Sequence, residues 1–132
     1  MKALSAALIL LAFPANAAAC RCFTGMTLDQ QMQSHDVVFA GQVSEIRPPS
    51  GGDVQVTFLV TSRIKGHPGN IAKVSIASDP AACGYVRPFF RKHNIYVVFT
   101  DTTPSGLETS RCSPNKLGPP SSIAVEAMRN GT

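Results

Sequence analysis

The stretch VQVTFLVT (residues 54–61) decides the fold class of this chain. Its apolar side chains stand at every second position, at Val54, Val56, Phe58 and Val60, with polar residues between most of them. Successive side chains of a β-strand point to opposite faces, so this period of two predicts a strand with one buried face. It is the clearest strand signal in the sequence.

Working outward from it, similar signals predict further strands at residues 37–46, 71–77, 94–99 and 107–112. The stretch 94–99 is almost wholly apolar, which is typical of a strand buried on both faces. The stretch RPPSGG (47–52) predicts a turn or exposed loop. Thr27 followed by Gln30 is a capping box, so a short helix is expected from there to about residue 34. These elements predict a mostly β protein, a five-stranded antiparallel OB-type barrel with one or two short helices.

The first nineteen residues have the three parts of a secretory signal: Lys2, an apolar run over 3–13, and small residues that end in Ala17-Ala18-Ala19. Cleavage after Ala19 would leave residues 20–132 as one domain beginning at Cys20. The apolar run is too short to cross a bilayer, so no retained transmembrane segment is expected. We therefore expect a secreted or periplasmic protein; an alternative is a lipoprotein acylated at Cys20, although a lipobox normally has Leu where Ala17 stands.

The end of the chain predicts little regular structure. Residues 113–122 are rich in Pro, Ser and Gly and are expected to form a loop. Residues 123–129 could form one or two helical turns before Asn130-Gly131 stops them.

Composition and motifs give no support for an enzyme. The formal net charge of +4 is too mild to indicate a nucleic-acid or anionic-membrane partner. The histidines, His35, His67 and His93, stand far apart without metal-ligand spacing, so surface or capping roles are expected. Neither a G-x-S-x-G motif nor a glycine-rich phosphate loop is present.

A basic group lies at Arg87, Arg91, Lys92 and His93, beside two phenylalanines. A solvated loop is the simpler interpretation. The alternative is a surface that meets an acidic partner or a sulfated polysaccharide.

Four cysteines, Cys20, Cys22, Cys83 and Cys112, all follow the expected signal. An even number in a small exported chain indicates a disulfide framework. A bridge between Cys20 and Cys22 would strain the bond geometry, so each is expected to reach forward to Cys83 or Cys112. The competing interpretation is a zinc site made of the four thiols, although the spacing lacks the paired short intervals of zinc knuckles.

The chain contains CRC (20–22) at the expected cleavage site, DVVFAGQV (36–43), IKG (64–66), CGY (83–85) and the late Cys112. Together these motifs resemble the N-terminal domain of the tissue inhibitors of metalloproteinases, which is a netrin-like domain. The resemblance covers nearly all of residues 20–132, and the style of the signal is typical of bacteria.

The resemblance implies a netrin-like OB barrel with disulfides Cys20–Cys83 and Cys22–Cys112. It also implies that the amine and carbonyl of Cys20 chelate the catalytic zinc of a target metalloprotease, and that Arg21 enters the protease's primary specificity pocket. Ala81 and Ala82 would pack beside this wedge of Cys20, Arg21 and Cys22. The zinc belongs to the target, and no cofactor of the chain's own is implied.

Arg21 stands where the animal inhibitors usually have a small hydroxyl residue, which indicates a different protease specificity. From the resemblance, the first functional hypothesis is a monomeric inhibitor of zinc metalloproteases. The second is a binding or structural module that shares the barrel and inhibits nothing, because a fold does not fix a function.

Overall fold

The computed structural model describes residues 20–121. The expected signal at residues 1–19 and the expected C-terminal helix at 123–129 lie outside the described residues. The elements, in chain order, are α1 (Leu28–Ser34), β1 (Val37–Ser50), β2 (Asp53–Lys65), β3 (Ile71–Ala77), the 3-10 helix η1 (Pro80–Ala82), β4 (Ile95–Thr103), β5 (Gly106–Glu108) and β6 (Lys116–Leu117).

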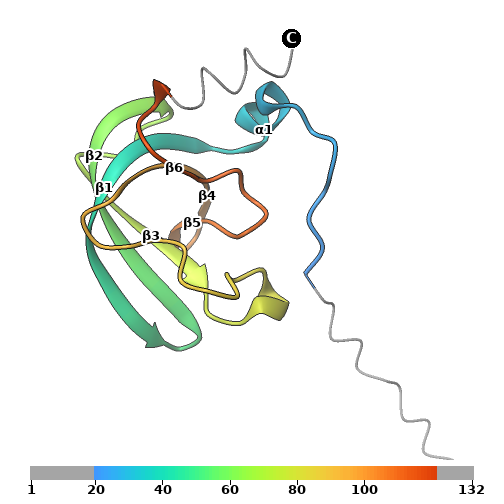
Figure 1. Cartoon of the computed structure of the whole chain (residues 1–132), viewed down its shortest axis with the longest axis vertical. Helices are drawn as coiled ribbons and strands as arrows, with labels where there is room; N and C mark the ends of the chain where they lie inside the picture. Colours follow the sequence, from blue (N-terminus) through green and yellow to red (C-terminus); the bar gives the residue numbers. More distant parts are fainter. Residues whose placement is uncertain (1–19, 122–132) are drawn as a thin grey trace, which may run out of the picture.

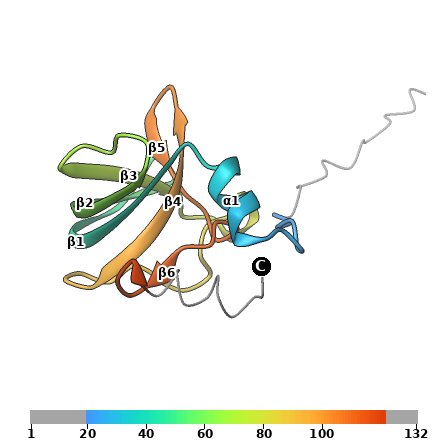
Figure 2. The ribbon, with the colours of Figure 1, turned by 90° about the horizontal axis from the view of Figure 1, so that it is seen from above.

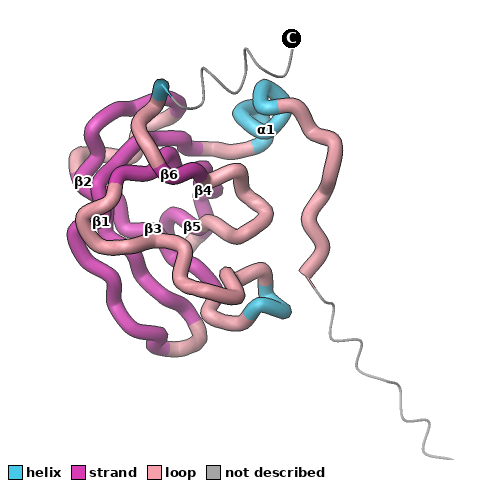
Figure 3. The backbone as a smooth tube through the Cα atoms, viewed as in Figure 1, coloured by secondary structure: helices cyan, strands magenta, loops and turns pink. Residues whose placement is uncertain are grey.

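Strands β1 to β5 close into a barrel, which is seen as a ring of ribbons in Figure 1 and as a ring of magenta tube in Figure 3. The neighbours run β1-β2-β3-β5-β4, and β4 pairs back onto β1. All these pairings are antiparallel except β3 with β5, which is parallel. The prediction of a mostly antiparallel, five-stranded OB-type barrel is confirmed, and β3 with β5 is its one parallel pair.

The barrel interior is an apolar cluster made by the inward residues of the strands. Phe39, Val56, Phe58, Val74 and Val98 are each at most 1% exposed. The period of two in 54–61 therefore places Val56 and Phe58 in the core as expected. Full burial of such a side chain contributes roughly 1.5–3 kcal/mol, so this cluster is the main source of the barrel's stability.

A second apolar cluster lies on the outside of β1 and β4. Its buried members are Val38, Ala40, Val97 and Phe99, and Leu28 and Met32 pack against them from α1. Figure 2 shows α1 beside these strands. The helix is the reason why residues 96–99 of β4 are buried on both faces, because one face points into the barrel and the other meets α1.

Both ends of α1 are capped. Thr27 and Gln30 form the predicted capping box, each side chain accepting from the other's backbone N–H. At the other end, Lys65 Nζ donates to the carbonyls of Met32 (2.9 Å), Gln33 (3.2 Å) and His35. A cation is favourable there because the carbonyls at a helix C-terminus carry partial negative charge.

Three strands end elsewhere than predicted, and one of them, β4, runs on to Thr103 instead of ending at residue 99. Strand β1 continues through Pro48-Pro49 to Ser50, so only Gly51-Gly52 form the turn. The prolines are tolerated because the register shifts between Arg47 and Ser50, and no regular pairing needs their missing N–H groups. Strand β5 ends at Glu108 because residues 110–112 turn towards the disulfides.

The expected loop at 113–122 contains a short strand, β6. It extends the sheet at β4, with Tyr96 opposite Leu117, and Gly118 N donates to Ile95 O at 2.9 Å. Over residues 20–121, no helix has the length and apolar character that a membrane crossing would need.

Candidate functional site

Two disulfides, Cys20–Cys83 and Cys22–Cys112, attach the start of the described chain to later loops. In each, the Cα atoms are 5.0 Å apart, although the partners are 63 and 90 residues apart in sequence. The pairing that the resemblance implied is therefore confirmed.

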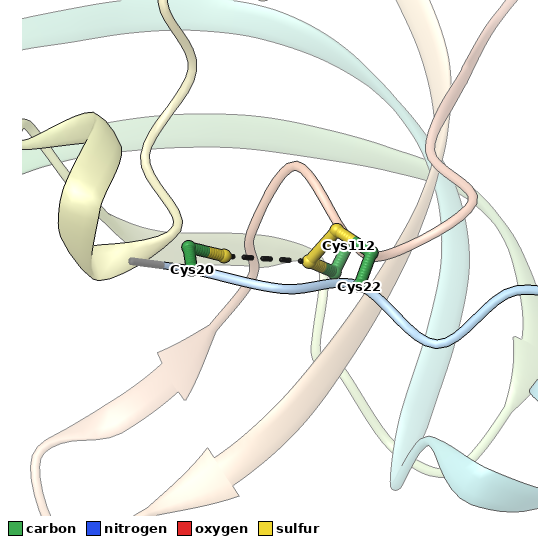
Figure 4. A group of neighbouring side chains, drawn as sticks. All are labelled: Cys20, Cys22 and Cys112. Atoms are coloured by element: carbon green, nitrogen blue, oxygen red, sulfur yellow. Dashed lines mark hydrogen bonds between the residues drawn. A yellow bond between two sulfur atoms is a disulfide. The ribbon is translucent and has the colours of Figure 1, made fainter. Parts of the chain in front are cut away.

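The two bridges lie against each other. Figure 4 shows Cys20 facing Cys112, with 3.5 Å between their sulfur atoms. Three of the sulfurs lie within 4.8 Å of one another, but all four cysteines are bonded in disulfides. The alternative of a zinc site made of four thiols is wrong, because thiolates are the zinc ligands and none is left.

The segment that receives Cys20 is shaped by a single helical turn. The Asp79 side chain accepts from Ala81 N at 2.9 Å and so caps η1, and Pro80 begins it. Cys83 ends it in the left-handed conformation (φ 68°), which is uncommon for a residue other than glycine. This turn directs the Cys83 side chain to Cys20 and leaves Ala81 and Ala82 exposed.

Gly84 is required by a close approach of two backbones. A Cβ at this position would overlap the carbonyl oxygen of Ala77 and lie 2.9 Å from that of Asp79. The glycine of the CGY motif therefore allows the loop after η1 to pass directly over the end of β3.

Arg111 joins the separate segments of the site. Its guanidinium donates to the carbonyls of Pro80 (2.8 Å), Gly84 (3.2 Å) and Cys20 (3.3 Å). Its backbone N–H also donates to Cys83 O at 3.0 Å. The position of the Cys20 carbonyl is thus fixed by a charged donor as well as by a disulfide, and a carbonyl oxygen retains a second lone pair for another partner.

Tyr85 connects the CGY motif to the loop that follows Cys112. Its hydroxyl accepts from Asn115 Nδ2 at 3.0 Å, and the same amide donates to Thr109 Oγ1 at 2.8 Å. Asn115 Oδ1 accepts from Phe99 N at 2.7 Å, which anchors this network to β4. Burial raises the pKa of Tyr85 above its ordinary value, and the Asn115 hydrogen bond opposes that shift.

The residues of the expected wedge lie at the surface beside η1. Arg21 and Cys22 are exposed, and Phe23 is 92% exposed. The Cys20–Cys83 bond and Arg111 bring this segment against residues 80–84, which contain Ala81 and Ala82. Chemically, the arrangement presents a short rigid backbone segment with one long cationic side chain.

The other candidate residues lie apart from this site. Arg87, Arg91, Lys92 and His93 are exposed, as expected of a solvated loop. His35 is the C-cap of α1, with Nδ1 3.3 Å from Asp101 Oδ1. Arg111 and Asn115 were not predicted as site residues, because their partners are backbone and side-chain groups brought together only by the fold; the nearest signal was that Arg111 precedes Cys112.

Comparison with known proteins assigns no family to the chain. No protein-family model matches it, and no curated protein matches its sequence significantly. The likeness to the tissue inhibitors of metalloproteinases therefore stays a prediction from the motifs.

Proposed function

We propose that this protein is an exported inhibitor of zinc metalloproteases that caps the target's zinc with the amine and carbonyl of a mature N-terminal Cys20. The observation that carries the proposal is the anchoring of residues 20–22. Both cysteines are bonded to the body of the protein, and Arg21 between them is exposed. The proposal requires cleavage after Ala19, which lies outside the described residues.

The chemistry of such a cap is simple. A catalytic zinc has three protein ligands and an open position for water or substrate; a neutral amine with a neighbouring carbonyl would displace that water and bind as a chelate, with the zinc five-coordinate. An α-amine has a pKa of about 8, so a substantial unprotonated fraction is available near neutral pH. Zinc binding favours that form further.

Rigidity supports the affinity of this cap. A flexible N-terminus would lose conformational freedom on docking, and that loss weakens binding. Here the disulfides and the hydrogen bond from Arg111 to Cys20 O restrict the segment before it meets a partner. Arg21 would then select proteases whose primary specificity pocket can pair with a guanidinium.

The test is an insertion of one alanine between Ala19 and Cys20, together with assays on secreted zinc metalloproteases that differ in the charge of the specificity pocket. Blocking the amine should abolish inhibition and leave the thermal unfolding temperature unchanged. The matched control is Lys73→Gln, an exposed change on β3 away from the wedge, which should retain the inhibition. Inhibition that survives the insertion would exclude chelation by Cys20.

A second measurement checks the starting residue. The intact mass and N-terminal sequence of the exported protein should show an unmodified Cys20 and two disulfides. A lipid on Cys20, or a start at Ala18, would remove the chelating amine and favour the non-inhibitory binding module instead.

A further inference from the structure

A pocket of about 340 Å³ opens between the β1–β2 hairpin and the segment 85–90. Its size lies within the range of roughly 300–1,000 Å³ that is usual for small-molecule sites. Its lining includes no residue of the proposed wedge or of the alanines beside it, which are Cys20, Arg21, Cys22, Ala81 and Ala82. The pocket is therefore a separate feature from the proposed zinc-capping segment.

The floor of the pocket is part of the barrel core. Val56 is 1% exposed, and Ile76 and Phe90 are each 5% exposed. One wall is the stacked pair Tyr85 and Phe89, whose rings are 4.8 Å apart and nearly parallel. The Tyr85 hydroxyl is engaged by Asn115. These surfaces favour a flat or linear apolar group in the interior.

The charged groups of the pocket all have one sign. Arg47 and Arg87 are the ionisable lining residues apart from Tyr85, and no aspartate or glutamate lines it among the described residues. Arg47 Nε donates to Glu45 at 3.2 Å, an exposed pair, which leaves its terminal nitrogens for another acceptor. Within residues 20–121, Arg87 has no ion pair or side-chain hydrogen bond.

From this juxtaposition we propose that the pocket binds a small amphipathic carboxylate, with its apolar body on the floor and its carboxylate at Arg47 and Arg87. A guanidinium suits this role because its planar N–H groups match the two oxygens of a carboxylate. The exposed positions of both arginines place the charge at the rim, where the head group keeps part of its hydration. The site selects for negative charge at the mouth and for apolar shape in the interior.

The experiment titrates the oxidised protein, residues 20–132, with decanoate below its micelle concentration, followed by backbone amide NMR shifts. Decanol and decylammonium serve as neutral and cationic probes of the same chain length. Decanoate should shift residues around Val56, Ile76 and 85–90, and should bind most tightly of the three. The double variant Arg47→Gln/Arg87→Gln should weaken decanoate binding by roughly tenfold or more and leave decanol binding unchanged.

Lys73→Gln is the matched control, because it removes one exposed positive charge from β3 at a position that does not line the pocket. It should leave decanoate affinity within about twofold. The proposal is overturned if decanoate fails to bind, if decanol or decylammonium binds equally well, or if the shifts lie outside the pocket. The comparison of the three probes on the unmodified protein distinguishes these outcomes even if the double variant does not fold, and it is independent of any protease assay.

Discussion

Arg111 is the residue that converts two disulfides into one rigid site. Each bridge fixes a pair of sulfur atoms, but the backbone of residues 20–22 and 80–84 could still rotate around them. The guanidinium donates to one carbonyl in the first of these segments and to two in the second. Charged donors of this kind contribute more than neutral ones, roughly 1.5–3 kcal/mol each in favourable settings.

Replacing Arg111 by methionine should therefore lower the free energy of unfolding by roughly 2 kcal/mol, because three carbonyls lose a half-buried charged donor. Urea unfolding measures this, and amide hydrogen exchange should become faster in residues 20–23 and 80–84. Arg63→Met is the control, because Arg63 is exposed and, among residues 20–121, its side chain hydrogen-bonds only Asn70. Equal effects of the two substitutions would contradict the joining role of Arg111.

Tyr85 should make the free energy of unfolding depend on pH in the alkaline range. Its pKa is raised above 10.0 in the folded protein, chiefly by burial, so the unfolded chain releases this proton first. The contribution of Tyr85 is then fully present below pH 10.0 and is lost as the pH rises towards the folded pKa. Urea unfolding on either side of pH 10.0 should show the wild type losing stability relative to Tyr85→Phe. If the difference in free energy of unfolding between the two proteins stayed constant across that range, Tyr85 would have the same pKa in the folded and unfolded states.

Helix α1 depends on the barrel for both its position and its C-terminal cap. It has seven residues, fewer than an isolated helix needs to be stable in water, so packing of Leu28 and Met32 on β1 and β4 maintains it. Lys65, at the end of β2, caps its last carbonyls. The helix therefore depends on the sheet for its stability.

Lys65→Met should keep the aliphatic packing and remove the donor to three carbonyls, at a cost of about 1 kcal/mol. Hydrogen exchange should accelerate in residues 31–35 before it does in the strands. Lys73→Met, an exposed substitution on β3, is the reference and should change stability by less than about 0.5 kcal/mol. If α1 exchanged no faster in Lys65→Met than in Lys73→Met, the capping role would be excluded.

The accuracy of the sequence predictions differs between the elements. Strand β3 has the predicted bounds, and Val56 and Phe58 point inward, because alternation of apolar residues records burial directly. Strand β6 was not predicted because its pairing to β4 comes from tertiary placement, with no apolar alternation of its own. The extension of β1 through Pro48-Pro49 was not predicted, because proline lacks the N–H group that a regular strand pairing needs. The register shift between Arg47 and Ser50 removes that need here. The cysteine spacing predicted the bridges only through a family resemblance; elimination alone left two pairings open.

In the molecule as a whole, the barrel and the site are stabilised by different interactions. The interior cluster contains no cysteine, whereas the site is held by disulfides and by Arg111. Closing loops of 63 and 90 residues contributes about 4 kcal/mol each in the chain-entropy description. The two parts should therefore respond differently to reduction.

Replacing Cys22 and Cys112 by serine together should lower the free energy of unfolding by about 4 kcal/mol. The barrel strands should stay protected from hydrogen exchange, while residues 22–27 lose protection and Cys20 stays held by its bond to Cys83. Guanidinium unfolding and exchange mass spectrometry measure the two effects. The control replaces Cys20 and Cys83 by serine, which should release residues 20–21 and leave residues 22–27 held. If the barrel strands lost their protection on removal of either disulfide, the core and the site would not be stabilised separately.

The Cys22–Cys112 bond also determines how the molecule would respond to a mechanical pull. Tension applied between a point before Cys22 and a point after Cys112 would pass through the sulfur–sulfur bond and bypass residues 23–111, which include strands β1 to β5. The barrel would then carry no load while its ends were stretched, and only the short flanking segments would extend. In a single-molecule stretching experiment, the oxidised protein should show almost no unfolding length, and reduction should restore the full extension of the barrel.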